Sequence, residues 1–167
     1  MLREVDRQVA AATDGKTVDL AIAAVGAGSW AAAVVEHYKG ATTDTKIVSA
    51  EPPVAACLKE SLHCGENTSI TTGETIMNGM NCGSLSSIAW STLRDGIFAS
   101  VAVTDVESHR DVQYMQSQGI NAGPCGAGTL AALRALCEEA IIKESERKDM
   151  ITVLFSTEGG REYEIPN

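Results

Sequence analysis

Residues 18–29 read VDLAIAAVGAGS, an apolar run that ends at two closely spaced glycines. Residues 18–25 contain a single charged side chain. A short, nearly continuous apolar run that ends at glycine is typical of a strand buried on both faces of a parallel sheet. The sequence then predicts a helix over 29–38 and a second strand over 46–50. Residues 18–51 therefore form a strand, a glycine loop, a helix and a strand, the crossover that joins two parallel strands.

The rest of the chain continues this alternation of helices and strands. Predicted helices cover residues 2–12, 54–63, 87–95 and 104–118, and predicted strands cover 97–103 and 150–155. A second glycine-rich loop, over 121–128, is predicted to open a helix that runs to residue 140. The pattern predicts an α/β fold: an open, mostly parallel sheet with helices on both faces. No linker divides the chain, so residues 1–167 are expected to belong to one domain.

Composition and charge exclude several classes of protein. The 167 residues include 13 basic and 22 acidic side chains, a net charge of −9, and a nucleic-acid binder needs a concentrated positive face instead. The five cysteines are odd in number and form no C-x-x-C pair, so neither a disulfide framework nor a zinc site is expected.

The longest uncharged stretch of the sequence, residues 20–35, is too short to span a membrane. No basic and apolar leader opens the chain, and we expect a cytoplasmic location.

The glycine loop of Gly26, Ala27, Gly28 and Ser29 is the first candidate site. Free N–H groups and a partial positive charge at a helix N-terminus bind an anion without basic side chains. The loop fits a monophosphate cofactor such as pyridoxal phosphate. It also fits a dinucleotide, because Gly26, Gly28 and Ala31 match G-x-G-x-x-G/A and Glu51 ends the next strand, where a ribose-binding acid is expected. The plain structural alternative is a glycine turn that packs a strand against a helix.

Two further candidate sites follow later in the chain. Residues 156–160, STEGG, come directly after the last predicted strand, where ligands gather in open α/β sheets. The hydroxyl of Thr157 could bond a ligand there, and the alternative is a polar turn. Cys125 lies at a predicted helix start, where a lowered thiol pKa would make it a nucleophile. The alternative, which we favour, is a small residue packed in a tight turn.

Four segments in this order resemble the diaminopropionate ammonia-lyase family, a branch of the tryptophan-synthase-β-like, fold type II pyridoxal-phosphate enzymes. The segments are VGAGSWAAAVVEH (25–37), EP (51–52), TIMNGMNCG (75–83) with WSTLR (90–94), and STEG (156–159). The resemblance covers nearly the whole chain. It implies two α/β domains with pyridoxal 5′-phosphate between them, and a homodimer.

The resemblance also implies roles for five residues. Gly26, Ala27, Gly28 and Ser29 would hold the cofactor phosphate, and Thr157 would face the pyridine nitrogen. The family reaction removes ammonia from the small amino-acid substrate 2,3-diaminopropionate and gives pyruvate and a second ammonia. The cofactor supplies the electron sink, while the protein positions the reactants and transfers protons.

Two departures from the family pattern are important. Pro124-Cys125-Gly126-Ala127 stands where the family has Glu-Ser-Gly-Ala. The family's Schiff-base lysine lies in an asparagine- and glycine-containing motif well before the glycine loop. None of the lysines of this chain lies in such a motif: Lys16, Lys39, Lys46, Lys59, Lys143 and Lys148.

The missing lysine motif leads to one main expectation. The chain is expected to be the carboxyl-terminal part of such an enzyme, truncated at its N-terminus and inactive alone, so no residue in it is assigned a catalytic role. One alternative, based on the glycine fingerprint, is a dinucleotide-binding module. Another is a non-catalytic half-enzyme that pairs with a chain carrying the lysine.

Overall fold

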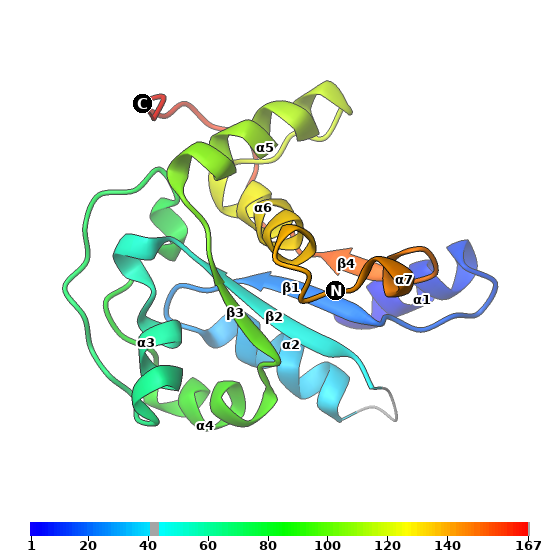
Figure 1. Cartoon of the computed structure of the whole chain (residues 1–167), viewed down its shortest axis with the longest axis horizontal. Helices are drawn as coiled ribbons and strands as arrows, with labels where there is room; N and C mark the ends of the chain where they lie inside the picture. Colours follow the sequence, from blue (N-terminus) through cyan, green and yellow to red (C-terminus); the bar gives the residue numbers. More distant parts are fainter. Residues whose placement is uncertain (41–43, 167) are drawn as a thin grey trace.

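Four parallel strands form the centre of the molecule. The computed structural model describes residues 1–40 and 44–166. The strands are β1 (Leu20–Ala24), β2 (Lys46–Glu51), β3 (Ala99–Ala102) and β4 (Thr152–Leu154). They lie in the order β3-β2-β1-β4, and all three pairings are parallel. The predicted α/β sheet is confirmed (Figure 1).

Helices cover both faces of the sheet because β1 and β2 are apolar on both faces. Ala21, Ala23 and Ile47 pack on one side with α2 (Ser29–Lys39) and α4 (Ser87–Gly96). Leu20, Ile22 and Val48 alternate with them and pack on the other side with α6 (Pro124–Glu138). This alternation follows from the two-residue period of a strand. The sheet therefore separates two hydrophobic clusters, one for each helical layer.

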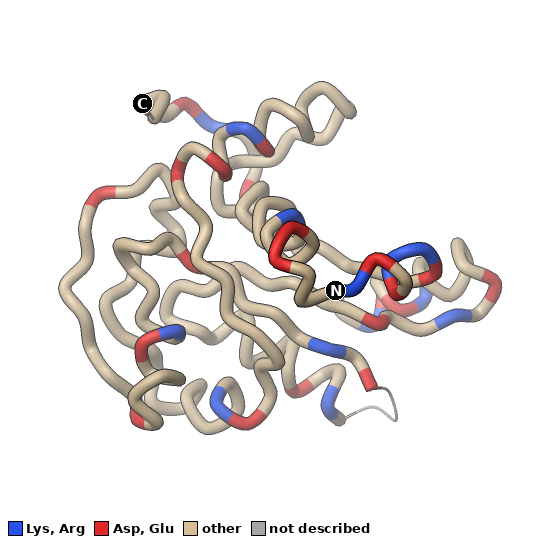
Figure 2. The backbone as a smooth tube through the Cα atoms, in the orientation of Figure 1, with Lys and Arg blue, Asp and Glu red and all other residues tan. Residues whose placement is uncertain are grey.

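The remaining helices complete these layers. They are α1 (Leu2–Ala12), α3 (Cys57–Cys64), α5 (Asp105–Ser117) and the short α7 (Glu144–Arg147), with 3-10 turns η1 (Pro53–Ala55) and η2 (Asn78–Met80). Helix α5 packs on α6, and α1 lies at the far end of the molecule from the C-terminus (Figure 1). Acidic and basic residues are interspersed along the chain, with no concentrated basic face in this view (Figure 2).

Most sequence predictions of elements are confirmed, and several boundaries are wrong. The structure contains the predicted helix at 2–12 and, one residue longer than predicted, the helix at 87–96. Strand β2 extends one residue past its predicted range to Glu51, and the other strands lie within theirs. However, α6 begins at Pro124, so the loop predicted over 121–128 ends at Gly123. Proline is favoured in the first turn of a helix, and here it outweighs the three glycines that suggested a loop. In the described part of the chain, no helix combines the length and the hydrophobicity that a membrane span requires.

Candidate functional site

The glycine loop connects the end of β1 to the start of α2. Gly28 is the N-cap residue and has a φ of 89°, a left-handed conformation that favours glycine. The first helical bond at this end of α2 runs from Ala32 N to Gly28 O, at 2.9 Å. The N–H groups of Ser29, Trp30 and Ala31 precede it and have no acceptor within the helix. The first turn of α2, directly after the loop, therefore offers three backbone N–H donors at the positive end of the helix.

This loop forms one wall of a pocket of about 320 Å³. All five residues predicted to bind the cofactor line this pocket: Gly26, Ala27, Gly28, Ser29 and Thr157. The other walls come from the η2 turn, through Gly79 and Met80, and from Cys125 and Glu158. Residues more than a hundred positions apart in sequence thus meet at the carboxyl ends of β1 and β4, where open α/β sheets bind ligands.

Close backbone packing shapes the pocket. A Cβ atom on Gly26 would lie 2.7 Å from the carbonyl oxygen of Gly79, so only glycine allows the two segments to approach so closely. A Cβ on Gly28 would lie 2.8 Å from Cδ1 of Leu93 in α4. Residues 76–83 have neither a helical nor a strand pattern of apolar residues, so Gly79 was not predicted as a pocket residue. Its place inside the resembling segment TIMNGMNCG was the available signal.

Glu158 is a pocket residue that the sequence analysis did not single out. Its Oε2 accepts a hydrogen bond from Cys125 N at 2.6 Å, and its Oε1 accepts one from Arg161 Nε at 2.9 Å. Its backbone oxygen also accepts from Gly123 N at 2.9 Å. The Glu158 side chain therefore binds a free N–H at the start of α6, where a carboxylate is favoured.

Cys125 is a packed residue and not an activated nucleophile. The residue is 6% exposed and lies against Gly79, whose Cβ would be 3.3 Å from its Sγ. Burial, followed by the nearby charge of Glu158, raises the pKa of the Cys125 thiol to about 11. The thiol is therefore protonated near neutral pH. The nucleophile reading of Cys125 is wrong, because burial and a carboxylate outweigh the helix N-terminus.

Glu51 cannot serve as a ribose-binding acid. It is completely buried, and its two carboxylate oxygens accept hydrogen bonds from Leu58 N (2.8 Å) and Lys59 N (2.9 Å) at the start of α3. Burial raises the pKa of Glu51 to about 6, although these two backbone bonds lower it. The dinucleotide fingerprint therefore loses its acidic member, which caps a helix in this chain.

The lining of the pocket suits a phosphate group bound by backbone amides. Ala27 and Ser29 are exposed at the loop, and no lysine or arginine lines the pocket. Its acidic lining residue, Glu158, is paired with Cys125 N and Arg161 Nε. A larger hollow of about 580 Å³ is lined by Glu74, Asp105, Glu162 and Glu164 with a single arginine, and its acidic groups repel an anion. Across residues 1–40 and 44–166, no three His, Cys, Asp or Glu side chains converge to hold a metal ion.

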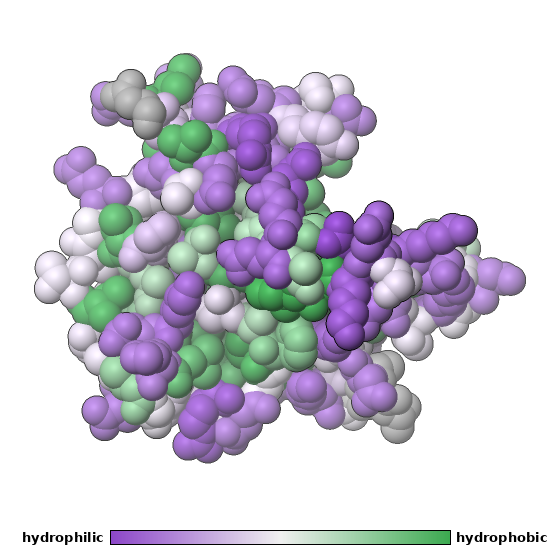
Figure 3. Space-filling view, viewed as in Figure 1, coloured by the Kyte–Doolittle hydropathy of each residue, from purple (hydrophilic) through white to green (hydrophobic). Residues whose placement is uncertain are grey.

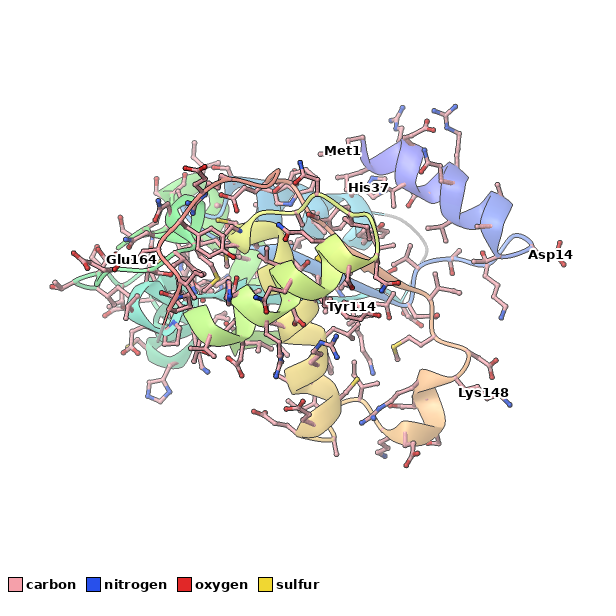
Figure 4. The ribbon with its side chains drawn as sticks, turned by 90° about the horizontal axis from the view of Figure 1, so that it is seen from above. Met1, Asp14, His37, Tyr114, Lys148 and Glu164 are labelled. Carbon is pink, nitrogen blue, oxygen red and sulfur yellow. The ribbon has the colours of Figure 1, made fainter. Side chains whose placement is uncertain are left out.

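The lysines all lie outside this pocket. Each of them is within the part of the chain that the structure describes, and none is among the pocket's lining residues. In the view of Figure 4, Lys148 beside α7 lies well away from Glu164 of the C-terminal segment that follows the pocket loop.

Comparison with known proteins identifies related chains. The family model described as "Pyridoxal-phosphate dependent enzyme" matches residues 2–156. The biosynthetic L-threonine dehydratase of Staphylococcus epidermidis is 28% identical over 145 residues, which are 84% of this chain and 33% of the dehydratase. The chain therefore spans about a third of the length of the curated relatives it matches.

Solved structures share the fold. The processed form of threonine deaminase isoform 2 from Solanum lycopersicum has a TM-score of 0.80 and 23% identity, covering 96% of this chain and 43% of the deaminase. Diaminopropionate ammonia-lyase from Escherichia coli has a TM-score of 0.79 and 23% identity, with coverages of 95% and 43%. Maize serine racemase has a TM-score of 0.78 and 21% identity, with coverages of 94% and 48%. At these identities the likeness shows the fold.

Proposed function

We propose a function for this chain from one premise: the chain belongs to the pyridoxal-phosphate dependent enzyme family, whose model matches residues 2–156. The cofactor of that family is pyridoxal 5′-phosphate, which acts when bound as an electron sink for the substrate's α-carbon. We propose that this chain forms the side of an active site that binds the cofactor phosphate and pyridine ring. The observation that carries the proposal is the meeting of the glycine loop and Thr157 in one pocket.

The chain's own residues divide the binding task. Backbone N–H groups of Gly26, Ala27, Gly28 and Ser29 donate to the phosphate, and the N-terminus of α2 adds its partial positive charge. Thr157 contacts the pyridine nitrogen across the pocket. A neutral hydroxyl there leaves this nitrogen without a proton, whereas a carboxylate would favour its protonated form.

The proposed reaction of the whole protein is the removal of ammonia from 2,3-diaminopropionate, with pyruvate and a second ammonia as products. The four resembling segments support this substrate, and the fold of the Escherichia coli ammonia-lyase agrees with it. The lysine that binds the cofactor covalently would come from outside these 167 residues, either from a missing amino-terminal half or from a partner chain. Assembly as a homodimer in the cytoplasm is part of the same proposal.

A second candidate is a dehydratase that acts on threonine. It is favoured by one observation, the 28% identity to the Staphylococcus epidermidis dehydratase. Product analysis of the protein purified from its source separates the two. 2,3-Diaminopropionate gives pyruvate with two ammonia molecules for each pyruvate, whereas threonine gives 2-oxobutanoate with one. Turnover of threonine without turnover of 2,3-diaminopropionate would contradict the first candidate.

Binding of pyridoxine 5′-phosphate tests the proposed pocket directly. This ligand carries an alcohol in place of the cofactor's aldehyde, so it forms no adduct with surface amines. Ala27→Asp places a negative charge on the exposed loop, and we expect its dissociation constant to rise about tenfold through repulsion of the phosphate. Equilibrium dialysis of the 167-residue chain gives this constant.

Ala33→Asp is the matched control for this experiment. Ala33 is also exposed and lies on α2, the helix that follows the loop, but beyond its N-terminal turn. The control adds the same charge and is expected to bind as the unchanged chain does. Equal affinities of the unchanged chain and Ala27→Asp, or no binding at all, would contradict the proposed pocket.

A further inference from the structure

Thr157 lies on the loop that follows β4, and its side chain is exposed. Its neighbour Phe155 is buried and bonds β1 through Phe155 N and Ile22 O at 3.1 Å, but Thr157 itself is exposed. A hydroxyl that must meet one ring atom needs its loop to be held in place, because loop motion weakens a directional hydrogen bond. The contacts of the next residues show what holds it.

Glu158 and Arg161 connect the Thr157 loop to two other pocket walls. The Glu158 carboxylate accepts from Cys125 N (2.6 Å) in α6 and from Arg161 Nε (2.9 Å). Arg161 in turn donates through Nη2 to the carbonyl oxygen of Ile76, which precedes the η2 turn and its pocket residue Gly79. These hydrogen bonds therefore link α6, the Thr157 loop and the η2 segment.

Two glycines at the start of α6, the N-cap residue Gly123 and Gly126, allow the loop to lie directly on the helix backbone. A Cβ on Gly123 would lie 2.4 Å from Gly159 O and 2.6 Å from Glu158 Oε2, and a Cβ on Gly126 would lie 2.3 Å from Ser156 Oγ. Ala122 and Gly159 also form an antiparallel bridge. The loop on both sides of Thr157 is thus seated on the first turn of α6.

We infer that Glu158 and Arg161 are positioning residues: together they hold the Thr157 hydroxyl where the cofactor's pyridine nitrogen is bound. The inference rests on the proposed function and adds residues that act through Thr157. The pair is partly exposed, with side-chain exposures of 23% for Glu158 and 30% for Arg161. Such pairs contribute little to global stability, so the consequence of losing this pair lies in the geometry of the pocket.

Two ligands separate the ring side of the pocket from the phosphate side. Inorganic phosphate occupies only the glycine loop, while pyridoxine 5′-phosphate also reaches Thr157. Arg161→Gln removes the link to Ile76 and leaves the Glu158 bond to Cys125. Glu158→Gln keeps an acceptor for Cys125 N and loses the ion pair with Arg161. Both variants are therefore expected to fold, and thermal unfolding checks this.

We expect both variants to raise the dissociation constant of pyridoxine 5′-phosphate about fivefold, the loss of roughly one hydrogen bond, with the constant of inorganic phosphate unchanged. Thr157→Val should produce the same loss. The double variant Thr157→Val/Arg161→Gln should lose no more than Thr157→Val alone, because the two residues act on one contact. Arg94→Gln, which breaks an exposed ion pair with Asp95 on α4, is the control and should bind both ligands normally.

The binding measurements can contradict either the inference or the proposed function. Unchanged affinity for pyridoxine 5′-phosphate in both variants would overturn the inference. Equal weakening of both ligands, or losses that add in the double variant, would also overturn it, because the pair would then act on the whole pocket or independently of Thr157. Failure of the unchanged chain to bind pyridoxine 5′-phosphate would overturn the proposed function itself, and the inference with it.

Discussion

Two glycines with the same backbone conformation differ in their surroundings. Gly15 and Gly28 have φ values of 84° and 89°, but a Cβ on Gly15 would meet nothing within 4 Å, whereas one on Gly28 would meet Leu93. We expect Gly15→Ala to cost about 1–2 kcal/mol of unfolding free energy, from backbone strain alone. Gly28→Ala should cost clearly more, because strain and a steric clash combine. Urea unfolding measures both, and equal costs would show that Leu93 moves aside freely.

The buried carboxyl of Glu51 makes stability depend on pH. Its pKa of about 6 in the folded chain lies above the ordinary value of 4.5. A raised acid pKa means that the folded state holds the proton more tightly, so this contribution is present below pH 4.5 and is lost as the pH rises through 6. Between these values we expect the unchanged chain to lose about 2 kcal/mol relative to Glu51→Gln.

Chemical unfolding of both chains across this pH range tests the expectation. Glu139→Gln removes an exposed carboxyl and should retain the pH dependence of the unchanged chain. A Glu51→Gln variant that follows the same curve as the unchanged chain would refute the role of Glu51.

Individual residues show where sequence reasoning succeeds and where it stops. Gly26, Gly28 and Thr157 were predicted because a glycine loop and a strand-end hydroxyl leave local patterns, and all three line one pocket. Glu158 was missed because its partners, Cys125 and Arg161, come together only when β4 and α6 are in place. Glu51 ends a strand as predicted, but it caps α3 and does not face a ligand as a ribose-binding acid would. The sequence did not reveal this, since the burial of Glu51 depends on α3 packing over it.

At the level of elements, α5 begins with a capping box, in which Thr104 precedes the helix and Glu107 follows three residues later. Glu107 N donates to Thr104 Oγ1 at 3.3 Å, and Thr104 N donates to Glu107 Oε2 at 2.7 Å. We expect Thr104→Ala to lower the unfolding free energy by about 1 kcal/mol, because the helix loses a cap. Ser86→Ala is the matched control: Ser86 precedes α4, but its side chain makes no capping bond. Equal effects of the two changes in urea unfolding would argue against the cap.

Element boundaries were less predictable than the elements. Strand β4 is three residues long where six were predicted, and α6 begins before Gly126 and Gly128, two of the glycines that suggested a loop. In both places tertiary contacts decide the outcome. Glycines inside α6 give the 156–159 loop access to the helix backbone, which local propensity cannot reveal.

At the level of the whole molecule, the lysines determine what the chain can do alone. Since none lines the pocket, we expect the 167-residue chain with pyridoxal 5′-phosphate to release no more pyruvate from 2,3-diaminopropionate than the free cofactor does. A lactate dehydrogenase-coupled assay measures this. Protein-dependent pyruvate release that Ala27→Asp abolishes would contradict the expectation.

Part of the molecular surface is apolar. Apolar side chains gather near the middle of the face shown in Figure 3, with hydrophilic ones around them. Strands β3 and β4 end the sheet on either side and are only partly buried. Unpaired strand edges and apolar side chains such as Ile88, 88% exposed on α4, favour association with another protein surface.

The glycine loop has one more consequence. Peptide amides do not gain or lose protons in ordinary buffers, and they attract no cloud of counterions as a cluster of lysines would. The affinity of a phosphate ligand for the loop should therefore fall less with rising salt concentration than it would for a cluster of lysines. Across mildly acidic to mildly alkaline solution, its affinity should follow the second ionisation of its own phosphate and no titration of the loop.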